Sequence, residues 1–222
     1  MSEPGSETLE APSCRTIKTE RLRLRTFGLD DSEAMLPIIS RPEVMQWTSA
    51  APVTNLDQAR RWVSARALGP DVFNFVIELK GLASADPTAQ PSIIGVVGSF
   101  HWPMVGYLLH PDHFGKGYAT EALRAFVPAM WDKMPSASEG GTGFDYLEGG
   151  VIRENRGSQR VLEKAGFTLC ETRVGDFENP TRGLCDSMFY RIARPGRTLE
   201  ELGMGPVDGD GGADSPPVPP VQ

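Results

Sequence analysis

Apolar and polar residues change their spacing along the chain, from alternation to helical periods and back. Residues 20–26 (ERLRLRT) alternate charged and apolar side chains, which predicts a half-buried strand. Residues 56–68 repeat apolar side chains every three or four positions, which predicts a helix. The same patterns predict strands at 20–26, 73–79, 93–100, 105–109, 146–152, 167–172 and 187–192, and helices at 30–39, 56–68, 117–133 and 156–165. Pro128 is expected to kink or shorten the third helix.

Composition separates a patterned body from two acidic ends. Residues 203–222 combine Gly, Pro and Asp with almost no large apolar side chains, so they cannot bury enough surface to offset the entropy of ordering. We therefore expect one domain of mixed α/β (α+β) class over residues 16–199. Disordered acidic tails are expected at residues 1–15 and 200–222.

Charge and cysteine content narrow the function classes. The first fourteen residues hold three acids and no base, and residues 200–222 hold five acids and no base, so the 22 basic residues face 21 acids in between. Such a nearly neutral body is a poor nucleic-acid binder, because phosphate contacts dominate that affinity. Three cysteines without regular spacing predict neither a disulfide scaffold nor a zinc site, and we expect no metal.

The hydropathy pattern also bears on location. No apolar run approaches the roughly 20 residues that span a bilayer. The N-terminal stretch, MSEPGSETLEAPSC, is acidic and lacks the apolar core of a signal peptide. We expect a cytoplasmic protein with reduced thiols and no membrane partner.

The most informative segment is residues 105–123 (VGYLLHPDHFGKGYATEAL), a predicted strand that passes through a glycine-rich turn into a helix. Gly115 and Gly117 lack a Cβ, so the backbone can turn sharply and an anion can approach it. Backbone N–H groups at a helix N-terminus bind phosphate without a basic side chain. A Walker A loop would need Ser or Thr after Gly-Lys, and a dinucleotide-binding loop would need glycine at Thr120. By itself the segment is more typical of a plain tight turn than of a phosphate site.

A second segment, residues 154–167 (ENRGSQRVLEKAGF), reads alone as an ordinary helix capped by Asn155. Together, GYLLHPDHFGKGYATEAL and N-x-x-S-x-x-V-L-x-K-x-G-F resemble the GNAT superfamily of acetyl-CoA-dependent N-acetyltransferases. The subgroup that the segments resemble most includes the ribosomal-protein alanine N-acetyltransferases. The resemblance runs from about residue 20 to about residue 194, which is nearly all of the patterned body.

The resemblance implies a fold and a reaction. The GNAT fold has a central mixed, mostly antiparallel twisted sheet, splayed between its fourth and fifth strands and flanked by about four helices. Members transfer acetyl from acetyl-CoA directly to a primary amine in a ternary complex, releasing coenzyme A. The amine here could be a protein N-terminus or a small molecule, and the protein a monomer or homodimer.

The resemblance also implies which residues bind acetyl-CoA. The backbone of the glycine turn is expected to bind the pyrophosphate, and the strand before it, bulged away from the next strand, to pair with the pantetheine arm. Phe114 stands where the family usually has Gln or Arg. The expected cofactor-binding residues are Leu108, Leu109, His110, Phe114, Gly115, Lys116, Gly117, Tyr118, Ala119, Thr120, Asn155 and Ser158.

Acetyl transfer needs a deprotonated amine, donors for the oxyanion and a proton for the thiolate. The resemblance implies an oxyanion donor in the backbone N–H of Leu108 or Leu109. The last helix lacks the tyrosine that often protonates the thiolate in the family, so Ser158 is the candidate for that role, with Asn155 beside it. His101 is the candidate general base.

Other readings stay open at this stage. Glu78 or Glu148 could act as the base through water. Acceptor specificity is expected from residues 41–55 and from a loop over residues 173–186, in which Asp176 and Glu178 would favour a cationic amine. The alternative functions are a non-catalytic GNAT-fold module that binds acyl-CoA as a sensor or interaction partner, and an interaction protein that docks through its proline-rich tail.

Overall fold

The structure is a computed structural model that describes residues 15–69, 71–80, 92–138, 140 and 143–206. The tails predicted at residues 1–15 and 200–222 lie outside this part of the chain except for residues 15 and 200–206. Hydrogen-bonded turns over residues 198–204 continue the described chain beyond the predicted domain boundary at residue 199.

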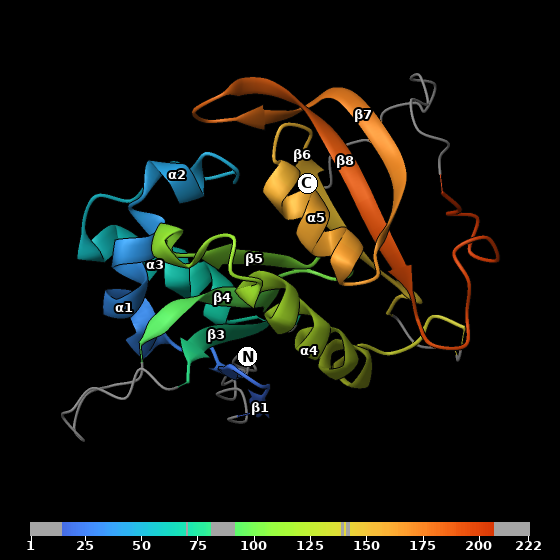
Figure 1. The fold of residues 1–222 in the computed structure, drawn as a ribbon, viewed down its shortest axis with the longest axis horizontal. Helices are drawn as coiled ribbons and strands as arrows, with labels where there is room; N and C mark the ends of the chain where they lie inside the picture. The colour runs from blue at the N-terminus through green and yellow to red at the C-terminus, as the bar shows by residue number, and fades with distance from the viewer. Residues whose placement is uncertain (1–14, 70, 81–91, 139, 141–142, 207–222) are drawn as a thin grey trace, which may run out of the picture.

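Two antiparallel sheets form the frame (Figure 1). The first sheet follows chain order: β1 (Thr16–Lys18), β2 (Leu22–Thr26), β3 (Phe73–Leu79), β4 (Ile93–Ser99) and β5 (Gly106–Leu109). The second has the order β6 (Tyr146–Ile152), β8 (Gly183–Ala193) and β7 (Thr168–Asn179). A single parallel bridge between Met104 and Glu148 joins the two sheets.

The splay predicted between the fourth and fifth expected strands, here β5 and β6, is confirmed: in the described part of the chain the two sheets are bridged at Met104, just before β5, and β5 itself does not pair with β6. The N–H of Val105 donates to the Glu148 carbonyl at 2.8 Å, and the N–H of Glu148 donates to the Pro103 carbonyl at 3.0 Å. The bulge expected in this strand is absent, because β5 pairs with β4 in unbroken register from Gly106 to Leu109. The gap therefore comes from the divergence of the two sheets.

Helices cover both faces of the first sheet. On one face, α1 (Ser32–Ile39) and α3 (Leu56–Ala67) pack against the side chains of Val76 and Val96. On the other face, α4 (Tyr118–Lys133) packs against Phe75 and Ile77, which alternate with Val76 along β3 as strand geometry requires. The short α2 (Pro42–Met45) joins the first group, α5 (Arg156–Lys164) packs against α4 and β6, and the 3-10 turns are η1 (Leu29–Asp31) and η2 (Pro111–His113).

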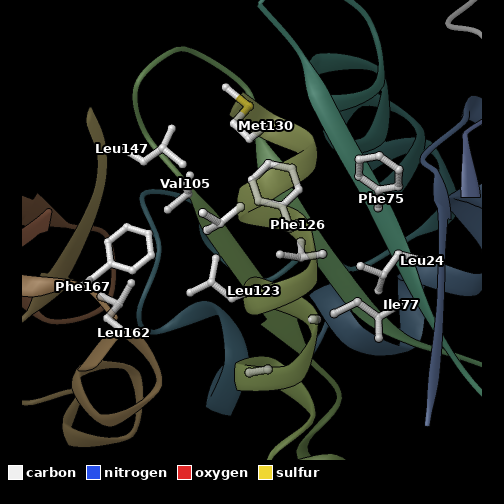
Figure 2. Close-up of a cluster of buried hydrophobic side chains, with 14 of the residues drawn as sticks. Leu24, Phe75, Ile77, Val105, Leu123, Phe126, Met130, Leu147, Leu162 and Phe167 are labelled. Carbon is white, nitrogen blue, oxygen red and sulfur yellow. The ribbon is translucent and has the colours of Figure 1, made fainter. Parts of the chain in front are cut away.

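One apolar core connects the two sheets through α4. Figure 2 shows Leu123 and Phe126 of α4 between Ile77 of the first sheet and Leu162 of α5. Pro128 leaves α4 unbroken from Tyr118 to Lys133, so the expected shortening is wrong. The pyrrolidine ring lies on the exposed side of the helix, and burial of the opposite face offsets the missing backbone hydrogen bond.

The prediction of a loop over residues 173–186 is also wrong. The strands β7 and β8 run on to Asn179 and from Gly183, so these residues form a long hairpin. A register shift between Arg173 and Phe177 interrupts the pairing and obscures the period-two pattern. The sequence patterns also missed β1 and α2, which have only three and four residues.

Candidate active site

A cleft of about 660 Å³ lies where β5 and β6 separate. Its walls come from β5, β6, α5 and the segment between η2 and α4. At one side, residues of α2 and α3 and the segment between them complete the wall, among them Trp47 and Trp62. The cleft therefore joins the glycine turn to the region that the sequence assigned to the acceptor.

The glycine turn gives the cleft a cradle of backbone donors. Gly115 and Gly117 have φ angles of +70° and +81°, which side chains with a Cβ rarely adopt. The first helical hydrogen bond of α4 runs from the N–H of Glu121 to the Gly117 carbonyl, so the N–H groups of residues 118–120 have no helical partner. These groups point outward at the positive end of the helix dipole, which suits a phosphate.

Arg21 stabilises this turn through contacts with residues 116–121. Its guanidinium pairs with Glu121 at 2.7 Å, donates to the Lys116 carbonyl at 3.0 Å and stacks on the Tyr118 ring at 4.6 Å. Glu121 also accepts from Thr19 and from the backbone of Arg21. Burial opposes ionisation of Glu121, but these hydrogen bonds outweigh it and lower the pKa of the carboxyl group. The cradle of backbone donors is thus built on the Arg21–Glu121 ion pair.

The open edge of β5 offers a second row of backbone groups. The N–H of His110 donates to the Ile94 carbonyl of β4 at 2.8 Å. Because successive N–H groups of a strand point to opposite sides, the N–H of Leu109 points to the unpaired side and that of Leu108 points to β4. Of the two predicted oxyanion donors, only Leu109 therefore has its N–H on the open edge.

A pair of hydroxyl groups bridges the cleft. Tyr107 of β5 places its phenol oxygen 2.7 Å from Ser158 Oγ on α5 and donates to the Ser158 carbonyl at 3.1 Å. Asn155 caps this helix, accepting from the Ser158 N–H at 3.1 Å. Burial raises the pKa of Tyr107 well above its usual range, although the hydrogen bond to Ser158 opposes this. The phenol consequently stays protonated, and sequence reasoning missed it although it directly precedes Leu108.

Most of the predicted cofactor-binding residues meet at this cleft. Its lining includes Leu108, Leu109, Phe114, Gly115, Gly117, Tyr118, Ala119, Thr120, Asn155 and Ser158. His110 and Lys116 are not part of the lining. The His110 Nδ1 instead accepts from the Asp112 N–H at 3.3 Å and caps η2.

The predicted bases lie elsewhere. His101 is exposed, packs against the Phe100 ring with centroids 4.8 Å apart and is not part of the cleft lining. Glu78 is 2% exposed and binds Arg23 and Arg25, and Glu148 pairs with Arg191. No Asp or Glu among the described residues lines the cleft. Asp176 and Glu178 are exposed on the β7–β8 hairpin outside the lining, so they do not support a cationic acceptor.

Other site chemistry is limited in the described residues. They contain no group of three or more His, Cys, Asp or Glu side chains placed to hold a metal ion. Cys170 and Cys185 are buried free thiols. Within the same part of the chain, every helix is too short or too polar to span a lipid bilayer.

Comparison with known proteins gives consistent results. Residues 21–168 match the family model described as an acetyltransferase (GNAT) domain. The uncharacterized N-acetyltransferase p20 of Bacillus licheniformis is 25% identical over 190 residues, covering 81% of this chain and 96% of that protein.

Solved structures share the fold. RimL, a ribosomal L7/L12 α-N-protein acetyltransferase in complex with coenzyme A, has a TM-score of 0.64 at 16% identity, covering 81% of this chain and 98% of that one. The microcin C7 self-immunity acetyltransferase MccE, in complex with acetyl-CoA and AMP, has a TM-score of 0.61 at 17% identity, covering 79% and 93%.

Proposed function

The chain belongs to the GNAT acetyltransferase family, and we propose that it transfers the acetyl group of acetyl-CoA directly to a primary amine. The observation that carries this proposal is the cleft itself, which connects the N–H cradle before α4 to the Tyr107–Ser158 pair along the open edge of β5. The p20 protein is named an N-acetyltransferase, and the RimL and MccE structures contain coenzyme A or acetyl-CoA.

The cleft fits an elongated acyl-CoA in three ways. The cradle over residues 115–120 suits the pyrophosphate. The unpaired backbone groups of β5 can hydrogen-bond the amides of the pantetheine arm as an added strand would. The described lining contains no carboxylate that would repel the phosphates.

In the proposed reaction, a neutral amine attacks the thioester carbonyl, the N–C bond forms and the C–S bond breaks. The N–H of Leu109, on the open edge of β5, is the proposed donor to the oxyanion. The departing thiolate takes a proton from Ser158, Ser158 takes one from Tyr107 across their 2.7 Å contact, and water returns a proton to the phenol. The proposed acceptor of the amine proton is water, because the described lining contains no carboxylate.

A test must separate turnover from binding. We expect acetyl-CoA to raise the melting temperature and coenzyme A to be released, detected as free thiol, when a panel of primary amines is added. A rise in melting temperature without thiol release from any amine would favour the non-catalytic acyl-CoA-binding module. Absence of both effects would contradict the proposal.

A further inference from the structure

A guanidinium in the cleft wall has no acidic partner among the described residues. Arg66, on the last turn of α3, lies between two aromatic side chains, its Cζ 4.1 Å from the Trp62 ring centroid and 5.6 Å from that of Phe100. The side chain donates one hydrogen bond, to the Trp62 carbonyl at 3.2 Å. Arg66 is half-buried, this burial lowers its pKa, and no acidic side chain of the described residues offsets the desolvation.

Arg66 lies at the end of the cleft away from the glycine turn. The Asn74 side chain donates to the Arg66 carbonyl at 2.7 Å, Asn74 pairs with Gly98 of β4, and Gly98 pairs with Gly106. Gly106 begins β5, whereas the turn follows its last residue, Leu109. The strand between them spans about 10 Å at the usual rise per residue. Arg66 therefore belongs to the acceptor side, and the pyrophosphate cradle does not explain it.

The other charged side chains of the described cleft lining are positive, like Arg66. The charged side chains that line the cleft in the described chain are Arg66, Arg160 and Lys164, without any Asp or Glu. A polycationic amine would meet only like charge there. A guanidinium that is flanked by rings and short of hydrogen-bond acceptors instead suits a carboxylate or phosphate, which its planar fork can bind with two hydrogen bonds.

We propose that the acceptor amine carries an anionic oxygen group, a carboxylate or a phosphate, which binds Arg66 while the amino group faces the thioester. This inference rests on the proposed acetyl transfer and adds the acceptor class to it. It replaces the expectation of a cationic acceptor, which depended on Asp176 and Glu178.

Matched acceptor pairs test this inference. Thiol release is measured at saturating acetyl-CoA with α-amino acids against their amides, and with phosphoethanolamine against ethanolamine. The first arm tests a carboxylate and the second a phosphate. We expect the member with the anionic group, in at least one pair, to have a kcat/KM at least tenfold higher than the member without it.

Variants of α3 assign the effect to Arg66. Arg66→Gln should raise KM for the anionic acceptor about tenfold or more and leave the uncharged partner within twofold. Arg66→Lys should retain part of the preference. Arg61→Gln removes the same charge from an exposed position of the same helix and should behave as wild type.

The outcomes separate the two proposals. Arg66→Gln should keep the wild-type rise in melting temperature with acetyl-CoA, which shows that fold and cofactor binding are intact. Three outcomes would overturn the anionic acceptor alone. Thiol release could be equal for both members of each pair, or it could be confined to amines without an anionic group. It could also be absent with every anionic amine although acetyl-CoA binds. Failure of wild type to bind acetyl-CoA would overturn the proposed function and this inference with it.

Discussion

In the proposed reaction, the Tyr107–Ser158 contact lets two neutral hydroxyl groups serve the departing thiolate. Ser158 sits in the first turn of α5, where Asn155 fixes its backbone, and Tyr107 reaches it from the opposite wall of the cleft. Burial keeps the phenol protonated, so it can donate to Ser158 at any physiological pH. Neither residue needs a charged partner for this role.

We predict that Tyr107→Phe lowers kcat about 10- to 100-fold and changes KM for acetyl-CoA little, because the ring still packs while the proton donor is lost. Ser158→Ala should have a similar effect, and the double variant should be little worse than either single one. Steady-state kinetics provide the measurement, with Tyr146→Phe, half-buried on β6 and not part of the cleft lining, as the control. A change confined to KM would assign Tyr107 a role in binding only.

The pH profile gives an independent check. Because the pKa of Tyr107 is raised above the ordinary value of 10, its proton is present below that pH and is lost only above the raised pKa. Rates should therefore increase with pH as the acceptor amine loses its proton and should not fall before about pH 10. A descending limb near neutrality that persists in Tyr107→Phe would point to a different proton donor.

Local sequence patterns can predict some of these residues and cannot predict others. The glycines of the turn, Asn155 and Ser158 lie within short sequence motifs, so spacing along the chain could single out these residues, which line the cleft. The Tyr107 contact joins residues 51 positions apart, and no local pattern contains it. His101 lies outside the cleft lining, and its position after a strand does not reveal which way the loop turns.

Among the elements, the β7–β8 hairpin supports the acceptor wall. Asn179 is 2% exposed and donates to the carbonyls of Gln46 and Thr48 at 3.0 and 2.9 Å, which ties the hairpin end to the segment after α2. Arg182 of the same turn stacks on Trp47 at 4.7 Å. Thr48 and Trp47 line the cleft, so the hairpin positions residues of the wall to which α2 and α3 contribute.

Asn179→Ala should therefore raise KM for the amine several-fold and leave the acetyl-CoA-induced rise in melting temperature unchanged. Loss of its buried hydrogen bonds should also destabilise the protein by about 1–3 kcal/mol. Glu178→Ala changes the exposed neighbour on the same strand and should have neither effect. Equal losses of acetyl-CoA and amine binding in Asn179→Ala would show that the hairpin supports the whole cleft.

Element prediction succeeded where burial imposes a period and failed where it does not. The strands β3 and β4 of the first sheet are covered on both faces, and their apolar runs marked them. Asp176 and Glu178 face solvent on the hairpin, and Gly175 adopts a φ of +58° at the register shift, so composition there resembles a loop. Backbone pairing between β7 and β8 makes this segment a hairpin, and the sequence of one strand alone does not reveal that pairing.

At the scale of the molecule, Arg194, which follows β8, links distant elements of the fold. It donates to the carbonyls of Trp131, Met134 and Phe144 and pairs with Asp145 at 3.2 Å, so it joins the end of α4 to the start of β6. Burial opposes ionisation of Asp145, but hydrogen bonds from Ser136 and Ser138 outweigh it and lower the pKa to about 2.

This carboxylate should make stability depend on acid. Its pKa is depressed in the folded state, so its contribution is complete above the unfolded value near 4 and is lost as the pH falls towards 2. Asp145→Asn should lower the urea midpoint at pH 6, and its deficit relative to wild type should shrink between pH 4 and pH 2. Asp132→Asn, at an exposed position of α4, should show no such convergence. A deficit that is constant with pH would assign Asp145 a packing role only.

The central claim is that the turn before α4 binds the pyrophosphate of acetyl-CoA. The most direct test is the melting temperature of wild type, Gly117→Glu and Gly196→Glu with and without millimolar acetyl-CoA. Both glycines have positive φ, +81° and +88°, so the two variants carry similar backbone strain, but only Gly117 lines the cleft.

At about 100 times its dissociation constant, a ligand specific for the native state adds roughly 2.7 kcal/mol, which corresponds to a shift of several degrees. If the turn binds the pyrophosphate, wild type and Gly196→Glu should show that shift and Gly117→Glu should lose it. No shift in wild type, or an equal shift in both variants, would contradict this claim.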